Sequence, residues 1–224
     1  MKAIDVITNE EIDAALSNWT PKGRDLIPAL VKGLDMALGK CKFDGAVLAG
    51  LEFAIEYGPW DVVSKASLIT AELAEKYDEA KTVIVRLAKA MRVQSRLGAI
   101  YSLSPLLRDD FVKEVIEGLI SDKSKKIREM AVDWVGRNRK KQFLPLVTTA
   151  LARESDEKMK GLITIEIAYL KDGFLVKREN GTVFVTVVLT TGRVGGFFNE
   201  SNKDELSDKE IADFFLKQIR GRTP

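Results

Sequence analysis

The sequence predicts a mainly helical protein, an α-solenoid of antiparallel helix pairs with a C-terminal three-stranded antiparallel β-meander and a final helix. Three observations predict this fold class. A two-helix segment recurs 32 residues downstream, turn residues divide the rest of the helical region, and the hydrophobic period changes after Lys171. We expect a helical repeat domain over residues 1–172. The meander and terminal helix, over 173–224, are expected to cap the solenoid.

The internal repeat consists of apolar and basic residues that recur at an offset of 32 positions. Phe111 aligns with Phe143, while Arg96 aligns with Arg128 and Arg128 with Lys160. Other matched pairs are Leu119 with Leu151, Ile127 with Met159, Ala131 with Ile163, and Val135 with Ile167. A period of this size with two helices per unit is typical of solenoids, in which successive pairs bury one another's apolar faces.

The individual helices are predicted from apolar spacing and from their start and stop signals. A capping box at 8–11 begins a short helix that ends near Trp19. Further helices are predicted over 26–38 with Gly39 as the stop, over 43–57, and from Pro59 toward Tyr77. Three pairs follow: 78–90 with 93–103, 111–120 (capped by Asp110) with 124–137, and 141–153 with 157–170.

Beyond Lys171-Asp172-Gly173 the pattern is that of strands. β-Branched and aromatic residues alternate with polar ones at Phe174 and Val176, at Val183, Val185 and Val187, and at Val194. Asn180-Gly181 and Thr191-Gly192 lie between these runs and favour tight hairpin turns. A loop is predicted over 199–205. A second capping box at 207–210 then begins a helix with Ile211, Phe214, Phe215 and Ile219 on its apolar side.

Charge and composition predict a soluble, cytoplasmic protein. The 224 residues include one cysteine, Cys41, and no apolar run near the roughly 18 residues that a membrane span requires. The N-terminus shows no secretion signal, so we expect no membrane partner. The net charge of +2 is unevenly distributed, with a local net of −5 over 52–79 and of +6 over 123–141. The basic segment either forms an ordinary solvated face or attracts an acidic protein or a phosphate backbone.

One feature of the repeat resembles the HEAT family. Asp122 precedes Arg128 by six residues, Glu154 precedes Lys160 by six, and Ala131-Val132 follow at the family's small-then-aliphatic positions. The resemblance covers about 78–170 well and 26–77 loosely, and Ala90 stands where the upstream acid is expected.

This resemblance implies that Asp122, Arg128, Glu154 and Lys160 hold adjacent repeats together. It also implies that partners contact outward residues of the second helices, on the concave side. The expected partner-binding residues are Lys125, Lys126, Glu129, Asp133, Arg137, Arg139 and Lys140.

The chain offers few residues for catalysis, and we expect no enzyme activity, metal or cofactor. The absence of histidine removes Ser-His, Cys-His and His-metal sites. Cys41 lies between Lys40 and Lys42 but has no histidine partner, and Asp109-Asp110 stand at a helix start. Trp134 is expected to pack in the core.

Two functions remain open at this point. The first is a non-catalytic protein-binding module, which resembles at fold level the bacterial immunity proteins that neutralise a toxin by binding it. Its partner would be another protein, for example an acidic toxin domain. The alternative is a nucleic-acid-binding protein related to the HEAT-like alkylpurine DNA glycosylases, with Asp133-Trp134 as its aspartate beside an aromatic ring. Its pI near 8.5 is low for a dedicated nucleic-acid-binding domain, so nucleic acid is the less favoured partner.

Overall fold

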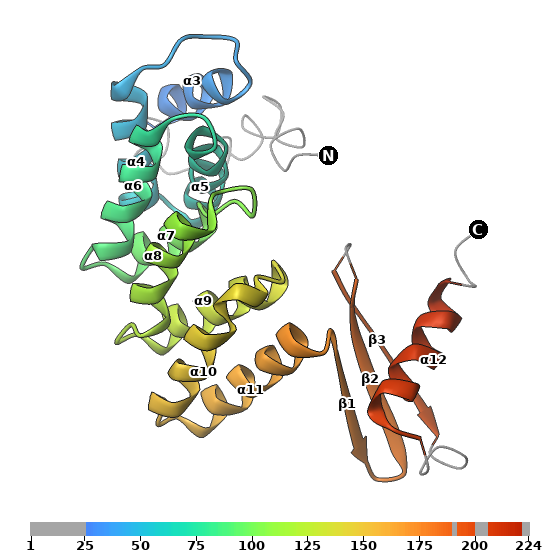
Figure 1. Ribbon diagram of the computed structural model, residues 1–224. Helices are drawn as coiled ribbons and strands as arrows, with labels where there is room; N and C mark the ends of the chain where they lie inside the picture. The colour runs from blue at the N-terminus through green and yellow to red at the C-terminus, as the bar shows by residue number, and fades with distance from the viewer. Residues whose placement is uncertain (1–25, 190–191, 200–205, 221–224) are drawn as a thin grey trace. The chain divides into compact units, whose positions relative to one another are not determined.

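The computed structural model describes residues 26–189, 192–199 and 206–220. Helices dominate these residues, and a three-stranded antiparallel sheet and a final helix follow them (Figure 1), so the predicted fold class is confirmed. The first predicted capping box and its helix lie outside the described residues. The same holds for Thr191 and for residues 200–205 of the predicted loop.

The chain divides into two compact units, Met1–Ala131 and Val132–Pro224. The division falls inside helix α9 (Lys125–Arg137), whereas the predicted domain boundary at 172/173 marks the change from helices to strands. The second unit therefore combines helices and sheet. Its helices α10 (Leu144–Arg153) and α11 (Glu157–Lys171) pack on one another, and α11 also contacts strand β1 (Phe174–Glu179).

Helices of the first unit follow one another as hairpins. They are α3 (Ile27–Ala37), α4 (Gly45–Tyr57), α5 (Trp60–Ala74), α6 (Asp78–Lys89), α7 (Val93–Tyr101), α8 (Asp109–Ile120) and the first half of α9. Helix α4 packs against α6 and α6 against α8, while α5 packs against α7 (Figure 1). Corresponding helices of successive hairpins thus cover one another, which is how a solenoid buries its apolar faces.

The predicted repeat is present in the element boundaries. Helices α7, α9 and α11 begin at Val93, Lys125 and Glu157, at intervals of 32 residues. Helix α8 and the 3₁₀ turn η2 (Lys141–Phe143) also begin 32 residues apart. The sequence periodicity therefore corresponds to a periodicity of secondary structure.

Two predicted helix starts were wrong. Helix α8 begins at Asp109, before the predicted start at Phe111, and its N-cap is Arg108 rather than Asp110. The Asp110 carboxylate instead accepts from the Phe111 amide at 2.9 Å. Acids in a first turn are favoured by the helix dipole whether or not they cap. The predicted helix from Lys141 begins only at Leu144, after η2, because Pro145 lacks an N–H and suits the first turn of an α-helix.

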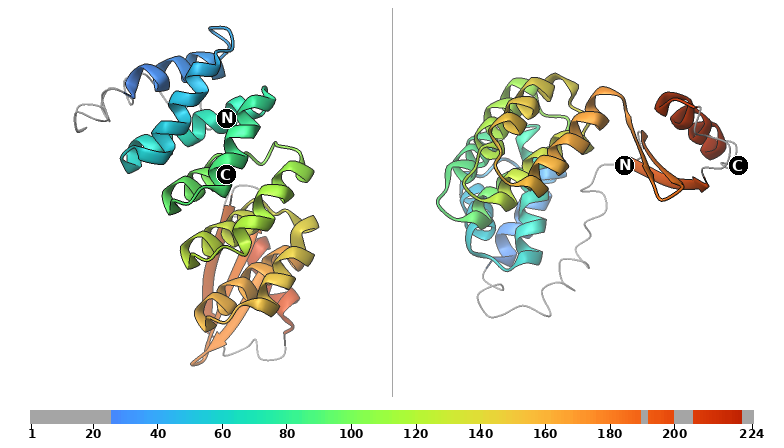
Figure 2. Two further views of the ribbon diagram at one scale, coloured as in Figure 1. Left: turned by 90° about the vertical axis from the view of Figure 1, so that its left-hand side faces the viewer. Right: turned by 90° about the horizontal axis from the view of Figure 1, so that it is seen from below.

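The sheet has strand order β1-β2-β3, with β2 over Thr182–Leu189 and β3 over Gly192–Asn199. Asn180 and Gly181 both have positive φ, 50° and 73°, as predicted for a two-residue hairpin turn. Helix α12 (Asp208–Arg220) covers one face of the sheet (Figures 1 and 2), where its apolar side packs on the central strand. Its predicted capping box is confirmed, since Ser207 N donates to Glu210 Oε2 at 2.8 Å.

An ion pair between a buried carboxylate and a partly buried arginine joins the sheet to α11. Glu166 of α11 is 3% exposed, and its carboxylate accepts two hydrogen bonds from Arg193 of β3, one of them at 2.8 Å. The Arg193 guanidinium also lies 4.3 Å from the centroid of the Tyr169 ring. Burial raises the pKa of the Glu166 carboxyl, and the ion pair with Arg193 opposes that rise.

Gly136 of α9 leaves the space that this ion pair occupies. A Cβ atom at position 136 would overlap the Glu166 carboxylate and lie 2.8 Å from Arg193 Nη2. A Cβ atom at Gly161, within α11, would meet no other atom within 4 Å, so Gly161 has no such role. The two helical glycines of the second unit therefore differ in their surroundings.

We expect Gly136→Ala to destabilise the second unit by about 3 kcal/mol, because the new methyl group displaces a buried ion pair. Gly161→Ala is the matched control and should stabilise α11 by about 0.5–1 kcal/mol. Hydrogen exchange of the β2 amides measures both effects. Equal protection in the two variants would contradict the assigned role of Gly136.

Candidate protein-binding edge

The first unit has an edge formed by the turns within its hairpins: α4–α5, α6–α7 and α8–α9. Gln94, in the first turn of α7, connects two of them. Its amide nitrogen lies within hydrogen-bonding distance of the carbonyls of Ile55, Glu56 and Gly58, at 3.1, 3.3 and 2.9 Å. Carbonyls at a helix C-terminus lack partners within the helix, so Gln94 satisfies groups that α4 leaves open.

Arg96 connects the α6–α7 turn to the α8–α9 turn. Its Nη1 donates to the carbonyls of Ala90 and Met91, at 2.8 and 2.7 Å. Its Nη2 donates to Asp122 Oδ1 at 3.1 Å, and Asp122 Oδ2 lies 2.7 Å from Nε. Arg96 is only 4% exposed. A buried guanidinium with one carboxylate and two carbonyls therefore joins successive hairpins.

The repeat equivalents of Arg96 differ from one another. Arg128 uses the same geometry within its own hairpin, since its Nη1 donates to the carbonyls of Asp122 and Lys123 at 2.9 and 3.3 Å. Lys160 instead donates to Glu157 at 2.7 Å, one turn earlier on α11. The lysine ammonium group lacks the planar, forked set of N–H donors of a guanidinium, so Lys160 does not reproduce the contacts of the two arginines with the turn carbonyls.

The turn acids have matching local contacts. Asp122 accepts from the Ser124 amide at 2.7 Å, and Glu154 accepts from the Asp156 amide at 3.1 Å. Asp122 thus accepts a hydrogen bond within its own turn and also pairs with Arg96 of the preceding hairpin. The structure shows an inter-hairpin ion pair between Asp122 and Arg96, which lies 26 residues earlier in the sequence.

An exposed apolar patch lies on this edge. We define the turn-edge patch as Phe53, Tyr57, Met91, Arg92 and Val93. Phe53 and Tyr57 are each 53% exposed, Met91 is 91% exposed and Val93 41%. The Phe53 and Tyr57 rings lie 4.8 Å apart, and the Arg92 guanidinium lies 4.6 Å from the Tyr57 ring centroid. The α4 end and the α6–α7 turn are therefore in direct contact through side chains that also face solvent.

The predicted partner-binding residues belong to both compact units. Lys125 and Lys126 are exposed in the first turn of α9, with Glu129 half-buried after them in the first unit. In the second unit, Arg137 donates to the Asp133 carboxylate at 2.9 Å; Arg139 is exposed with a φ of 51°, and Lys140 is half-buried.

The sequence reasoning missed the turn-edge patch. The sequence predicted partner contacts on the second helices, so Tyr57 was expected only as the end of a helix, and Met91, Arg92 and Val93 had no predicted partner-binding role. A usable signal was present: Met91 lies in the short connection between α6 and α7, and Val93 follows it directly as the first residue of α7.

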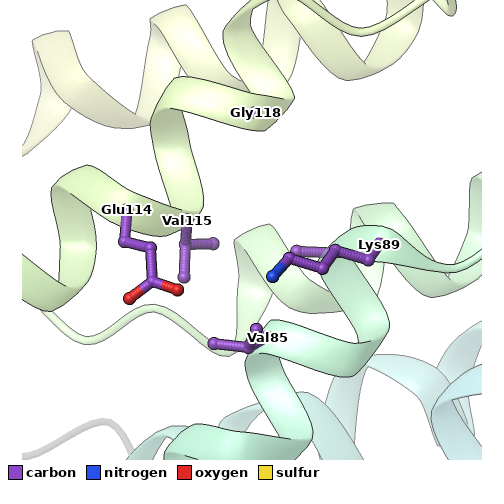
Figure 3. Close-up of a pocket in the computed structure, with 6 residues that line it drawn as sticks. Val85, Lys89, Glu114, Val115 and Gly118 are labelled. Carbon is purple, nitrogen blue, oxygen red and sulfur yellow. The ribbon is translucent and has the colours of Figure 1, made fainter.

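Two grooves lie between successive first helices of the first unit. The groove between α6 and α8 holds a cavity of about 50 Å³, and Lys89 and Glu114 extend toward it from facing helices (Figure 3). That volume suits a few water molecules. A second groove between α4 and α6 is larger, about 280 Å³, but open, and its Arg86 is already paired with Glu52 at 2.8 Å.

Chemical sites are sparse in the part of the chain that the structure describes. There, no group of three or more His, Cys, Asp or Glu side chains could hold a metal ion. Cys41 is half-buried, and its sulfur lies 3.8 Å from the Lys32 carbonyl oxygen. The pKa of Asp110 is lowered, chiefly by the hydrogen bond from the Phe111 amide. Within the same residues, no helix has the length and hydropathy needed to cross a membrane.

Comparisons with known proteins do not test the resemblance to the HEAT family. A scan against models of protein families finds no match, and searches of curated proteins and of solved structures also find none. The HEAT-like relationship therefore stays a prediction.

We expect Arg96→Met to destabilise the first unit by about 3 kcal/mol, because it removes the guanidinium that pairs with the Asp122 carboxylate and binds two turn carbonyls. Arg108→Met is the control. Arg108 also lies 2.7 Å from a carboxylate, that of Asp110, but on an exposed surface, so the urea midpoint should stay unchanged. Helical circular dichroism during urea unfolding measures both variants, and equal midpoints would contradict the bridging role of Arg96.

Proposed function

We propose that this chain is a non-catalytic protein-binding module that captures its partner on the turn edge of its first unit. The observation that supports this most is the turn-edge patch, in which Tyr57, Arg92 and Met91 are exposed together. Aromatic residues, methionine and arginine are enriched at protein interfaces, and tyrosine and arginine are frequent among the residues that dominate binding energy.

The charges beside the patch suggest the chemistry of the partner. Arg96 places the α8–α9 turn next to the α6–α7 turn, and Lys123, Lys125 and Lys126 are exposed there. Asp122, the acid among them, is engaged by Arg96. We therefore expect a partner that presents apolar side chains bordered by carboxylates, since complementary charges accelerate association and exclude wrong partners.

Pre-organisation of the edge also supports binding. Gln94 and Arg96 tie three consecutive turns together through hydrogen bonds to backbone carbonyls and to Asp122. A surface held in this way loses little conformational entropy when a partner docks, so more of the contact energy remains as affinity.

Toxin neutralisation is the particular form of this proposal that the sequence analysis suggests. In that form the partner is an acidic toxin domain, and docking on the turn edge covers the toxin's active site. Inhibition of the toxin by the wild-type chain, and loss of inhibition in turn-edge variants, would support it.

The nucleic-acid alternative is less favoured. A glycosylase needs an aspartate available beside an aromatic ring, and the Asp133 carboxylate accepts from Arg137 one helical turn away. Salt separates the two functions, because binding to a phosphate backbone weakens by orders of magnitude between about 50 and 200 mM salt.

The double variant Tyr57→Ala with Met91→Ser should reduce partner capture at least a hundredfold, because it removes two exposed interface side chains. Leu106→Ser is the matched control: Leu106 is 69% exposed but lies in the α7–α8 connection, away from the patch. Affinity capture from native lysate with quantitative mass spectrometry measures the loss. A protein captured equally by all three chains is not the partner that we propose.

Reversal of the neighbouring charges tests the electrostatic part separately. Lys125→Glu with Lys126→Glu should slow association without shifting thermal unfolding, because both side chains are exposed. Association rates from surface plasmon resonance at low and high salt provide the measurement. An unchanged rate at low salt would remove the basic turn from the binding surface.

A further inference from the structure

The two edges of the sheet differ in charge. Edge strand β1 carries Lys177, Arg178 and Glu179, and charged side chains at an edge discourage pairing with another chain. Edge strand β3 carries no charge after Arg193, through Val194, the two glycines and both phenylalanines to Asn199. Among the described strands it pairs with β2 alone. Within the described residues, the other side of β3 is therefore an edge that lacks charged side chains beyond Arg193.

The two adjacent glycines of β3 have different surroundings. A side chain at Gly196 would overlap the Phe215 ring of α12, so packing within the unit explains this glycine. Gly195 points to the opposite face, where the nearest atom to a Cβ would be Thr186 Oγ1 at an ordinary 3.4 Å. Glycine weakens a strand, and often marks a place where another group approaches closely. Among the described residues of the unit, no contact requires a glycine at position 195.

Phe197 lies two residues beyond Gly195 on that same face. It is 72% exposed, and its ring centroid is 6.4 Å from that of Phe184 on the neighbouring strand. The outer face thus presents an exposed ring and, two residues away along the edge, a position with no side chain. An aromatic ring placed across from an edge glycine compensates for the missing side chain.

We propose that β3 pairs antiparallel with β3 of a second copy of this chain. A two-fold axis at Gly196 places Phe197 of each copy opposite Gly195 of the other, because residues that face each other in an antiparallel pair lie on the same face of the sheet. The two sheets join into six strands, and each exposed ring covers the other copy's glycine. This surface is complementary to itself, as a two-fold interface must be.

Sedimentation equilibrium of the full chain tests the dimer. We expect a mass of twice 24.9 kDa at high micromolar concentration. Phe197→Lys should raise the dissociation constant at least a hundredfold, because two rings lose their burial and two charges meet at the edge. Leu106→Lys, an exposed apolar residue of the first unit, should leave the constant unchanged. A wild-type chain that stays monomeric, or a dimer that Phe197→Lys does not weaken, overturns the proposal.

Disulfide trapping tests the register. In a Cys41→Ser background, an equimolar mixture of Gly195→Cys and Phe197→Cys chains should form a crosslinked heterodimer under mild oxidation, since the proposed pairing makes these positions direct neighbours. Either variant alone should crosslink much more slowly. Equal crosslinking in all three samples, or no crosslink in the mixture, contradicts the two-fold axis at Gly196.

Discussion

The buried guanidinium of Arg96 is the interaction on which the first unit most depends. It donates to the carbonyls of its own turn and contacts the carboxylate of the next hairpin, so one side chain fixes the spacing of successive hairpins. A charge buried to this extent is stabilising only when its partners are all in place. The same contacts that stabilise the stack therefore also position the turns, and with them the exposed residues that the turns carry.

In the second unit, the ion pair between Glu166 and Arg193 also joins two structural elements. Glu166 and Arg193 join α11 to β3, and Gly136 of α9 provides the space for them. Both pairs connect elements distant in sequence, and in both the arginine uses its planar fork to contact two or more oxygens. Strand β3 is thus held at its start by α11 and along one side by β2, and no other described strand pairs with its second side.

The binding surface that we propose follows from this construction. Large apolar side chains at the turns have no core to enter, because the helices on either side already bury their apolar faces against the next hairpin. Phe53, Tyr57 and Met91 are exposed on the turn edge. If two chains associate through β3 as well, each assembly carries two such edges, and a partner with two matching sites gains avidity without any new contact.

The sequence by itself determined the elements and their period. Helix caps and tight turns depend on local chemistry, which acts over a few residues whatever the rest of the chain does. This explains why the sequence predicted the Asn180-Gly181 turn, the Ser207–Glu210 capping box and the boundaries that recur every 32 residues. Only the tertiary structure decided which distant groups meet. Asp122 pairs with Arg96, 26 residues earlier in the sequence, and Arg92 of the α6–α7 turn contacts the Tyr57 ring of the preceding hairpin. Such contacts depend on how helices stack, and the spacing of residues along one chain does not contain that information.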